Sequence, residues 1–388
     1  MLKIALGIWA CALCARAKGD GEYIPSVCAR FYTETLPNGL RVMVVEDTSR
    51  EYESLTLVYP GGYDRQLTTK PGLDELTATM AFSEAERHGA TDYFWEIRPA
   101  YRRFSFTFKA ERAEELAAYI AGAPMTLTTG KNFKPTVNKL VRRENLWLDD
   151  AAARDVISIF GDAWESAAFK APAYAYLKIA ESDLAESARS LTRFRGALAV
   201  FRGPLDHFFC IKIAARHFGK PTDDSTPPPP ELALPQEQEH HLASLAPTLM
   251  IHAVAFDTGA YRRLYPFLEF LRFRLEHECD PLHGKAALKI VTYSRTVLTM
   301  LILERAFFEH APLKDVFGAA DDMARRFRFE YPYRLEARLT DSYLDEYLIE
   351  MMLLGRAEDF CRRSIVSDVE FGAETFFNLP FVRIYGLP

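Results

Sequence analysis

The sequence predicts an α+β protein made of two similar α/β-sandwich halves joined by a proline-rich linker. Each half is expected to hold an antiparallel or mixed sheet with helices on one face. Three observations support this fold class. Runs with strand periodicity alternate with helical runs through the first half. The stretch 221–238 contains Pro227–Pro230 and cannot pack as a helix or a central strand. After it, the order of a strand followed by a long helix recurs.

The first half contains one strand with a clear alternation. Arg102–Lys109 places Phe104, Phe106 and Phe108 on one face, which predicts a half-buried strand. A base-stacking surface is the alternative, but the basic, glycine-rich context of such surfaces is missing. We expect Ser182 to cap a helix. The other expected elements are strands at 40–46, 54–59 and 197–203, and helices at 111–121, 134–150, 152–168, 182–191 and 204–218, the last ending at Gly219.

The stretch 72–82 predicts a short amphipathic helix after a Gly61-Gly62 turn. Pro71 is tolerated at a helix start, and Leu73, Leu76 and Met80 form an apolar stripe. Glu75 and Thr79 lie four residues apart and share a face, with Ala78 beside them. One carboxylate, one hydroxyl and one methyl cannot bind a zinc ion by themselves.

The second half repeats the style of the first. Asp257 is expected to open a long helix, 260–278, directly after a strand at 248–255. We predict a first domain at 24–220, the linker at 221–238, and a shortened second domain at 239–388. The four prolines could instead be a docking ligand for an aromatic groove. Further expected elements are a strand at 296–303 and helices at 312–326 and 341–354.

Charge and the length of apolar runs argue against a nucleic-acid-binding protein and a membrane-spanning protein. Hydrophobic residues make up 49% and charged residues 26%, which is typical of a globular protein with a sizeable core. The formal net charge of −6, with both signs interspersed, argues against a nucleic-acid binder. No run approaches the roughly 18 apolar residues of a membrane span.

Residues 1–17 resemble an export signal. Lys3 supplies a positive end, an apolar core follows, and Ala15-Arg16-Ala17 fits a cleavage site. We therefore predict an exported, periplasmic or envelope-associated protein. Lipid attachment at Cys11 or Cys14 is one alternative, and a short N-terminal strand or helix of a cytosolic protein is another.

Four cysteines remain after such cleavage: Cys28, Cys210, Cys279 and Cys361. They form no C-x-x-C motif and could make up to two disulfides, whose pairing the sequence does not determine. Cys210 lies in an apolar helical stretch, so we expect a buried free thiol there.

Several features taken in order resemble the opening of the insulinase/pitrilysin family of zinc peptidases. They are the run Leu36–Glu46, a strand, a glycine turn with Asp64-Arg65, and the helix ending at Phe82. The family carries H-x-x-E-H on this helix, two histidine ligands around a glutamate base. Here the five positions read Glu75-Leu76-Thr77-Ala78-Thr79, so both ligands and the base are missing.

The resemblance also implies roles for two residues further along the chain. Glu144, in Val141–Asn145, matches the family's third zinc ligand, although a solvated helix residue is the alternative. Tyr293 matches a tyrosine that contacts bound peptide between two halves, but the arginine expected before it is absent. A packed sheet tyrosine is the alternative there. We predict no metal cofactor, because catalytic zinc normally needs three protein ligands.

Other chemistry finds little support in the sequence. None of the nine histidines has H-x-x-E-H or H-E-x-x-H spacing, and His240-His241 is expected to be solvated in the linker's acidic end. Glu276–Cys279 could bind a metal adventitiously. There is no P-loop, G-x-S-x-G or G-x-G-x-x-G motif.

Three functions remain open. The first is an inactive family member that binds an active H-x-x-E-H subunit or a peptide in the chamber between its halves, as a homo- or heterodimer. The second is a free-standing binding or structural protein of the envelope. The third is a metalloendopeptidase with a non-standard zinc site, built from Glu75, Glu144 and a histidine. The missing ligands and base favour the first two.

Overall fold

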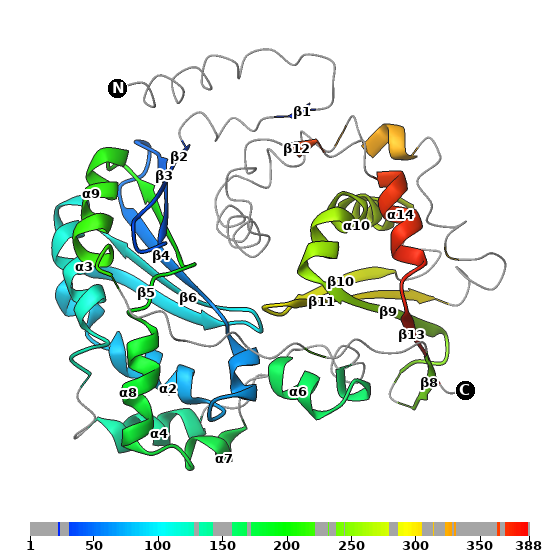
Figure 1. Ribbon diagram of the computed structural model, residues 1–388, viewed down its shortest axis with the longest axis horizontal. Coiled ribbons are helices and arrows are strands. Elements are labelled where there is room, and N and C mark those ends of the chain that lie inside the picture. The colour runs from blue at the N-terminus through cyan, green and yellow to red at the C-terminus, as the bar shows by residue number, and fades with distance from the viewer. Residues whose placement is uncertain are drawn as a thin grey trace. The chain divides into compact units, whose positions relative to one another are not determined.

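A computed structural model describes residues 22–23, 31–127, 132–142, 157–168, 172–221, 232, 238–243, 245–278, 286–304, 313, 323–327, 330, 363–364 and 369–386. The chain divides into two compact units (Figure 1). The first unit contains residues 30–147 and 166–230, and the second contains residues 1–29, 148–165 and 231–388.

The first unit is built on a mixed sheet of six described strands in the order β2-β3-β7-β4-β6-β5. Strands β3 and β7 are parallel, and all other neighbours are antiparallel. The predicted strands at 40–46, 54–59, 102–109 and 197–203 are all found. The bounds are β2 (Phe31–Thr35), β3 (Arg41–Glu46), β4 (Glu53–Pro60), β5 (Ala90–Ile97), β6 (Tyr101–Phe108) and β7 (Leu198–Gly203).

Helices α2, α3 and α9 pack on one face of this sheet. Phe104, Phe106 and Phe108 are buried on the face covered by α2, α3 and α9, as their alternation predicted. A second cluster joins α2 to α4, α7 and α8. The bounds are α2 (Leu73–Ala81), α3 (Ala113–Gly122), α4 (Phe133–Arg142), α7 (Ala173–Tyr176), α8 (Glu181–Ser190) and α9 (His207–Phe218), with 3-10 helices η2 (Tyr63–Leu67), η3 (Ala85–His88) and η4 (Ala110–Arg112).

The second unit is built on a mixed sheet of five described strands in the order β10-β11-β9-β13-β8. The long helix α10 (Thr258–Glu278) begins as predicted, with the backbone N–H of Ala260 donating to Asp257 Oδ1 at 2.7 Å. It packs against α14 (Val369–Phe377). The strands are β8 (Gln238–Leu242), β9 (Leu249–Asp257), β10 (Ala287–Thr292), β11 (Thr296–Glu304) and β13 (Phe381–Gly386), with a separate pair of β1 (Glu22–Tyr23) and β12 (Arg363–Ser364).

The two sheets share one topology. The order β3-β7-β4-β6-β5 in the first unit repeats as β8-β13-β9-β11-β10 in the second. The parallel pair β3–β7 corresponds to the parallel pair β8–β13, and every other matched pair is antiparallel. Strand β2 is the additional strand of the first sheet. The expectation of two similar α/β halves is therefore confirmed.

Several element predictions need correction. The helix expected over 152–168 is interrupted at Gly161, whose φ is +96°, and α6 (Asp162–Ala168) follows it. Ser182 lies inside α8, and Asp183 accepts the backbone N–H of Ala180 instead. The N-cap of α9 is Asp206, because its carboxylate accepts the N–H of Phe209. The edge strands β2, β5, β8 and β10 and the strand β13 were not predicted.

Some predictions lie outside the described residues: residues 1–17, Glu144, Cys28, Cys279 and Cys361, most of the linker, and the helix at 341–354. Cys210 is buried and free, as expected, and burial raises the pKa of its thiol. None of the described helices is both long and apolar enough to cross a membrane.

Candidate functional site

Helix α2 carries the three positions that the sequence singled out, and the fold holds it on two sides. Leu73 and Leu76 pack toward α4, α7 and α8, whereas Ala78 and Ala81 pack toward the sheet. Its N-terminus follows Gly72, whose φ of +83° favours glycine. The helix is therefore fixed between sheet and outer helices.

The side chains at these positions offer little chemistry. Ala78, where the family has its base, is fully buried among apolar groups. The hydroxyl of Thr79 donates to the backbone carbonyl of Glu75 at 2.8 Å, one turn earlier. Glu75 is 3% exposed, and among these three side chains its carboxylate is the one ionisable group. A methyl group cannot accept a proton from water, so this helix has no general base where the family has one.

Both carboxylate oxygens of Glu75 accept hydrogen bonds from tyrosines. Tyr63, on η2, donates to Oε1 at 3.4 Å, and Tyr176, on α7, donates to Oε2. Burial, and then the negative charge of Glu75, raises the pKa of Tyr63, so its phenol stays a protonated donor. The two phenols therefore bind the side chain that replaces the family's first histidine ligand.

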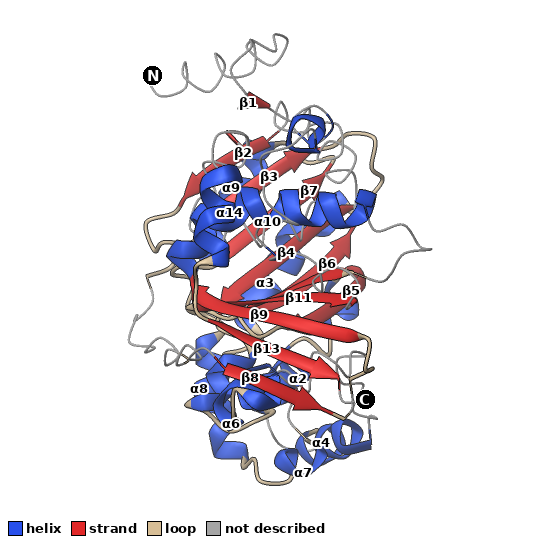
Figure 2. Cartoon of the chain, turned by 90° about the vertical axis from the view of Figure 1, so that its right-hand side faces the viewer, coloured by secondary structure: helices blue, strands red, loops and turns tan. Residues whose placement is uncertain are grey.

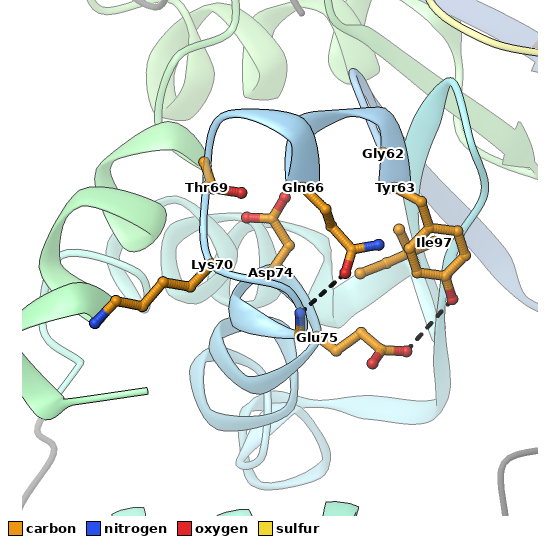
Figure 3. A pocket seen from close by; sticks show the side chains of 9 residues that line it. Gly62, Tyr63, Gln66, Thr69, Lys70, Asp74, Glu75 and Ile97 are labelled. Atoms are coloured by element: carbon orange, nitrogen blue, oxygen red, sulfur yellow. Dashed lines mark hydrogen bonds between the residues drawn. The ribbon is translucent and has the colours of Figure 1, made fainter. Parts of the chain in front are cut away.

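A small pocket opens beside this carboxylate (Figure 3). Its cavity volume is about 10 Å³, which is space for roughly one water molecule. Gln66 accepts the backbone N–H of Gly72 at 3.1 Å, and Lys70 pairs with Asp183 at 2.6 Å. The lining residues include no histidine or cysteine; they are Gly62, Tyr63, Gln66, Thr69, Lys70, Gly72, Asp74, Glu75 and Ile97.

A buried polar network anchors the start of α2. Asp74 accepts the hydroxyl proton of Ser187 at 2.9 Å and lies 3.5 Å from Arg65 and 3.7 Å from Arg102. Both guanidinium groups also donate to Ser190 Oγ, at 3.2 and 2.9 Å. Burial lowers the pKa of Arg102 to about 10, which still leaves it charged at neutral pH. The sequence alone did not indicate these partners.

The described residues contain no group of three His, Cys, Asp or Glu side chains that could hold a metal ion. Glu144, the residue matched to the third ligand, lies outside the described residues. The structure therefore brings no metal ligand to Glu75 from the part of the chain it describes. The prediction of an absent cofactor stays a prediction.

Tyr293 lies in the second unit, between β10 and β11. Its ring is 1% exposed and packs edge-to-face on Trp164, with ring centroids 5.2 Å apart. Its backbone N–H donates to the carbonyl of Thr296 at 2.8 Å, in the tight connection between these strands. This burial is what a packed sheet tyrosine requires, and the peptide-contact role stays a prediction.

His240 and His241, expected in the linker, lie on strand β8. They are adjacent on a strand, so their side chains point to opposite faces and cannot share a ligand. Glu276, His277 and Glu278 form the end of α10, and Cys279 lies outside the described residues.

No family model matches the sequence, and a search of curated proteins finds no significant relative. Solved structures do match. A protease from Helicobacter pylori is similar with a TM-score of 0.67 and 12% identity, over 94% of this chain and 100% of that one. The first half of the periplasmic protease PqqL from Escherichia coli also gives a TM-score of 0.67, at 9% identity over 94% and 93% of the two chains.

A third match is to a structure described as an inactive domain of a peptidase M16 from Pseudomonas fluorescens. Its TM-score is 0.63 at 16% identity, over 92% of this chain and 98% of that chain. At these identities the likeness concerns the fold. The chain thus has the fold of the M16 peptidases, the fold that the resemblance to the insulinase/pitrilysin family implied.

Proposed function

We propose that this chain is a catalytically inactive M16-like protein that binds a partner subunit or a peptide. One observation carries the proposal: Glu75, at the first ligand position, has both carboxylate oxygens bound by the phenols of Tyr63 and Tyr176. Ala78 supplies no base beside it. Hydrolysis by this family's chemistry needs a fixed metal and a group that takes a proton from water.

The open edge of the first sheet supports a binding role. Strand β5 ends the described sheet, so its outer backbone groups are available to an added strand. Phe94, on this strand, is 45% exposed, and the Arg103 guanidinium lies 5.0 Å from its ring centroid. An exposed aromatic on a strand that ends the described sheet suits an extended peptide with apolar side chains.

We also propose that the protein is exported to the periplasm or envelope. The support is the signal-like pattern of residues 1–17. A periplasmic protease among the structural matches agrees with this localisation. Lipid attachment at Cys11 or Cys14 is the alternative form of export.

The first experiment measures bound metal by mass spectrometry and hydrolysis of an unstructured protein such as casein, with and without chelator. An active H-x-x-E-H peptidase is the positive control. We expect no stoichiometric zinc and no turnover. One zinc per chain with chelator-sensitive cleavage would overturn the proposal in favour of a metalloendopeptidase with a non-standard site.

The second experiment tests binding with a pool of short fluorescent peptides and fluorescence anisotropy. F94S should weaken peptide binding several-fold, because it removes an apolar contact at the β5 edge. F208S is the matched control: Phe208 is 70% exposed and lies on α9, which packs on β3, and three strands separate β3 from β5. Equal affinities in both variants would remove β5 as the binding edge.

A further test separates a paired subunit from a free-standing binding protein. If the chain serves an active H-x-x-E-H subunit, adding it should increase that subunit's turnover of casein. If it acts alone, it should bind the peptide pool but leave the subunit's turnover unchanged. If the chain neither binds the peptide pool nor increases the subunit's turnover, the proposed function is contradicted.

A further inference from the structure

The repeated topology shows that one strand position is filled in the first sheet and open in the second. Strand β3 corresponds to β8, and β2 pairs antiparallel along the outer side of β3, from Phe31 opposite Val45 to Thr35 opposite Arg41. Within the described residues, β8 pairs with β13 on its inner side and ends the sheet on the other. Figure 2 shows β8 beside β13 at this edge.

The side chains of β8 are arranged to pair with a strand of the same sequence. Glu239 and His241 lie on one face, over their β13 neighbours: Glu239 is 3.8 Å from Arg383, and His241 stacks on Tyr385 with ring centroids 5.4 Å apart. His240 lies on the other face and contacts Gln238 at 3.0 Å. Gln238, Glu239 and His241 are exposed.

No lysine or proline, the residues that commonly block a sheet edge, occurs within β8. The edge is therefore chemically able to accept a further strand. The charge pattern decides which strand fits. An antiparallel partner that carries a histidine opposite Glu239 and a glutamate opposite His241 would form a hydrogen-bonded pair at both positions.

We propose that β8 pairs antiparallel with β8 of a second copy of this chain, with His240 on the two-fold axis. This register places Glu239 opposite His241 of the second copy, and the reverse pair forms by symmetry. Gln238 then lies opposite Leu242 of the second copy. The two five-stranded sheets become one continuous sheet, and each imidazole N–H donates to a carboxylate across the interface.

The contact between the two β8 strands is small, so the experiment must detect a weak dimer. Five residues from each copy bury less area than a stable interface usually does, so the dimer is expected to be weak and concentration-dependent. Sedimentation velocity over a wide concentration series suits such an equilibrium. The mass should rise with concentration from the 44.1 kDa of one chain toward twice that value.

The decisive variant is H241E, which places glutamates opposite each other at both pairs and leaves the Glu239–Arg383 contact in place. Its dissociation constant should rise about ten-fold, because like charges directly opposite destabilise strand pairing. The exchanged variant E239H/H241E restores opposite partners and should recover most of the dimer. T248E adds the same charge on the exposed turn before β9 and should leave the dimer unchanged.

A single-chain mass throughout the series would overturn the proposal, as would a dimer that H241E leaves unaffected. Circular dichroism checks that every variant is folded. This inference does not depend on the proposed function, because it concerns strand β8 of the second sheet and neither Glu75 nor strand β5 of the first.

Discussion

A corresponding pair of helices occurs in each half, and different kinds of contact hold the two pairs together. In each half, the helix after the central strand packs against the helix that precedes a later strand of the same sheet: α2 against α8, and α10 against α14. In the first half the contact adds a hydrogen bond from Ser187 to Asp74 to an apolar cluster that contains Leu76 and Leu184. In the second half it is aromatic, with Phe267 lying 5.6 and 5.8 Å from the rings of Phe376 and Phe377.

The aromatic contact depends on a close approach of the two helices. A Cβ at Gly372 would lie 2.5 Å from the Cβ of Phe267, so a larger residue on α14 would force the helices apart. The polar contact needs a complete set of partners, because buried charges are costly when one partner is missing. The same topology is therefore stabilised in two ways. Apolar packing holds α10, whereas α2 combines the packing of Leu73 and Leu76 with hydrogen bonds and ion pairs to Asp74.

The largest expected loss of stability follows from removing the aromatic contact between α10 and α14. F267A should destabilise the second half by about 4 kcal/mol, since it removes a fully buried ring and leaves a cavity. Hydrogen exchange in increasing denaturant, measured on peptides from each half, reads the two units separately. F94A, at a half-exposed ring of the first half, is the control and should change little. An equal loss in both halves would show that the units unfold together.

The next largest loss of stability is expected from removing the polar contacts of Asp74. D74A should destabilise the first half by about 3 kcal/mol, because Arg65 and Arg102 lose their shared carboxylate in a buried site. E84A, which breaks the exposed Glu84–Arg87 pair, should cost less than about 1 kcal/mol. The double variant D74A/R102M should cost less than the sum of its parts. Additive losses would mean that the two groups do not interact.

The buried titratable groups of the two halves also differ. Glu53, in the first half, is fully buried and its Oε2 accepts the N–H of Leu205 at 3.1 Å. Burial raises the pKa of Glu53 to about 7. In the second half, His252 is buried among Phe376, Phe377 and Phe381, next to Arg383. Burial, and then the charge of Arg383, lowers the pKa of His252 to about 3.

These shifts predict opposite pH responses. Between pH 7 and 4.5, folded Glu53 binds a proton that the unfolded chain does not, so the first half gains stability as pH falls. Below pH 6.5 the unfolded chain protonates His252 but the folded second half does not, so it loses stability down to about pH 3. At pH 5 the loss should reach about 2 kcal/mol relative to pH 8.

The measurement is the free energy of unfolding of each half at pH 5, 6, 7 and 8. E53Q should flatten the response of the first half, and H252F should flatten that of the second. Parallel curves for the two halves would contradict these assignments.

The sequence revealed the interior of the fold better than its edges. Strands β4, β6, β7 and β9 bury alternating or continuous apolar residues, and that pattern can be recognised without a structure. Strands β5 and β8 lie at sheet edges and expose Asp92, Phe94, Glu239 and His241, so no periodicity marks them. Strand β8 reads as Gln-Glu-His-His-Leu, which is also typical of a solvated linker.

The candidate site was predicted only in part for a related reason. The family resemblance located Glu75, Ala78 and Thr79 on a helix, where the structure has them. It could not show that Tyr176, 101 residues away in the chain, donates to Glu75. Nor could it show that Arg65 and Arg102 converge on Asp74. Local patterns report burial and turns, whereas these bonds depend on where distant elements meet.

The smallest expected effect concerns the phenols at Glu75. Y176F should destabilise the first half by about 1 kcal/mol, because it removes one donor while Tyr63 still donates to the other carboxylate oxygen. Y174F is the matched control: Tyr174 is on the same short helix but is 62% exposed, so its loss should be close to zero. The measurement is hydrogen exchange in increasing denaturant on peptides from each half, as for F267A, and the same measurement serves D74A.

The sign and size of this effect test the comparison of the two halves. If α2 is held by directed bonds, removing one phenol loosens the first half alone and leaves the unfolding free energy of the second unchanged. If packing through Leu73 and Leu76 holds α2 instead, Y176F should behave like Y174F. If those two variants are equally stable, α2 is held by apolar packing, as α10 is.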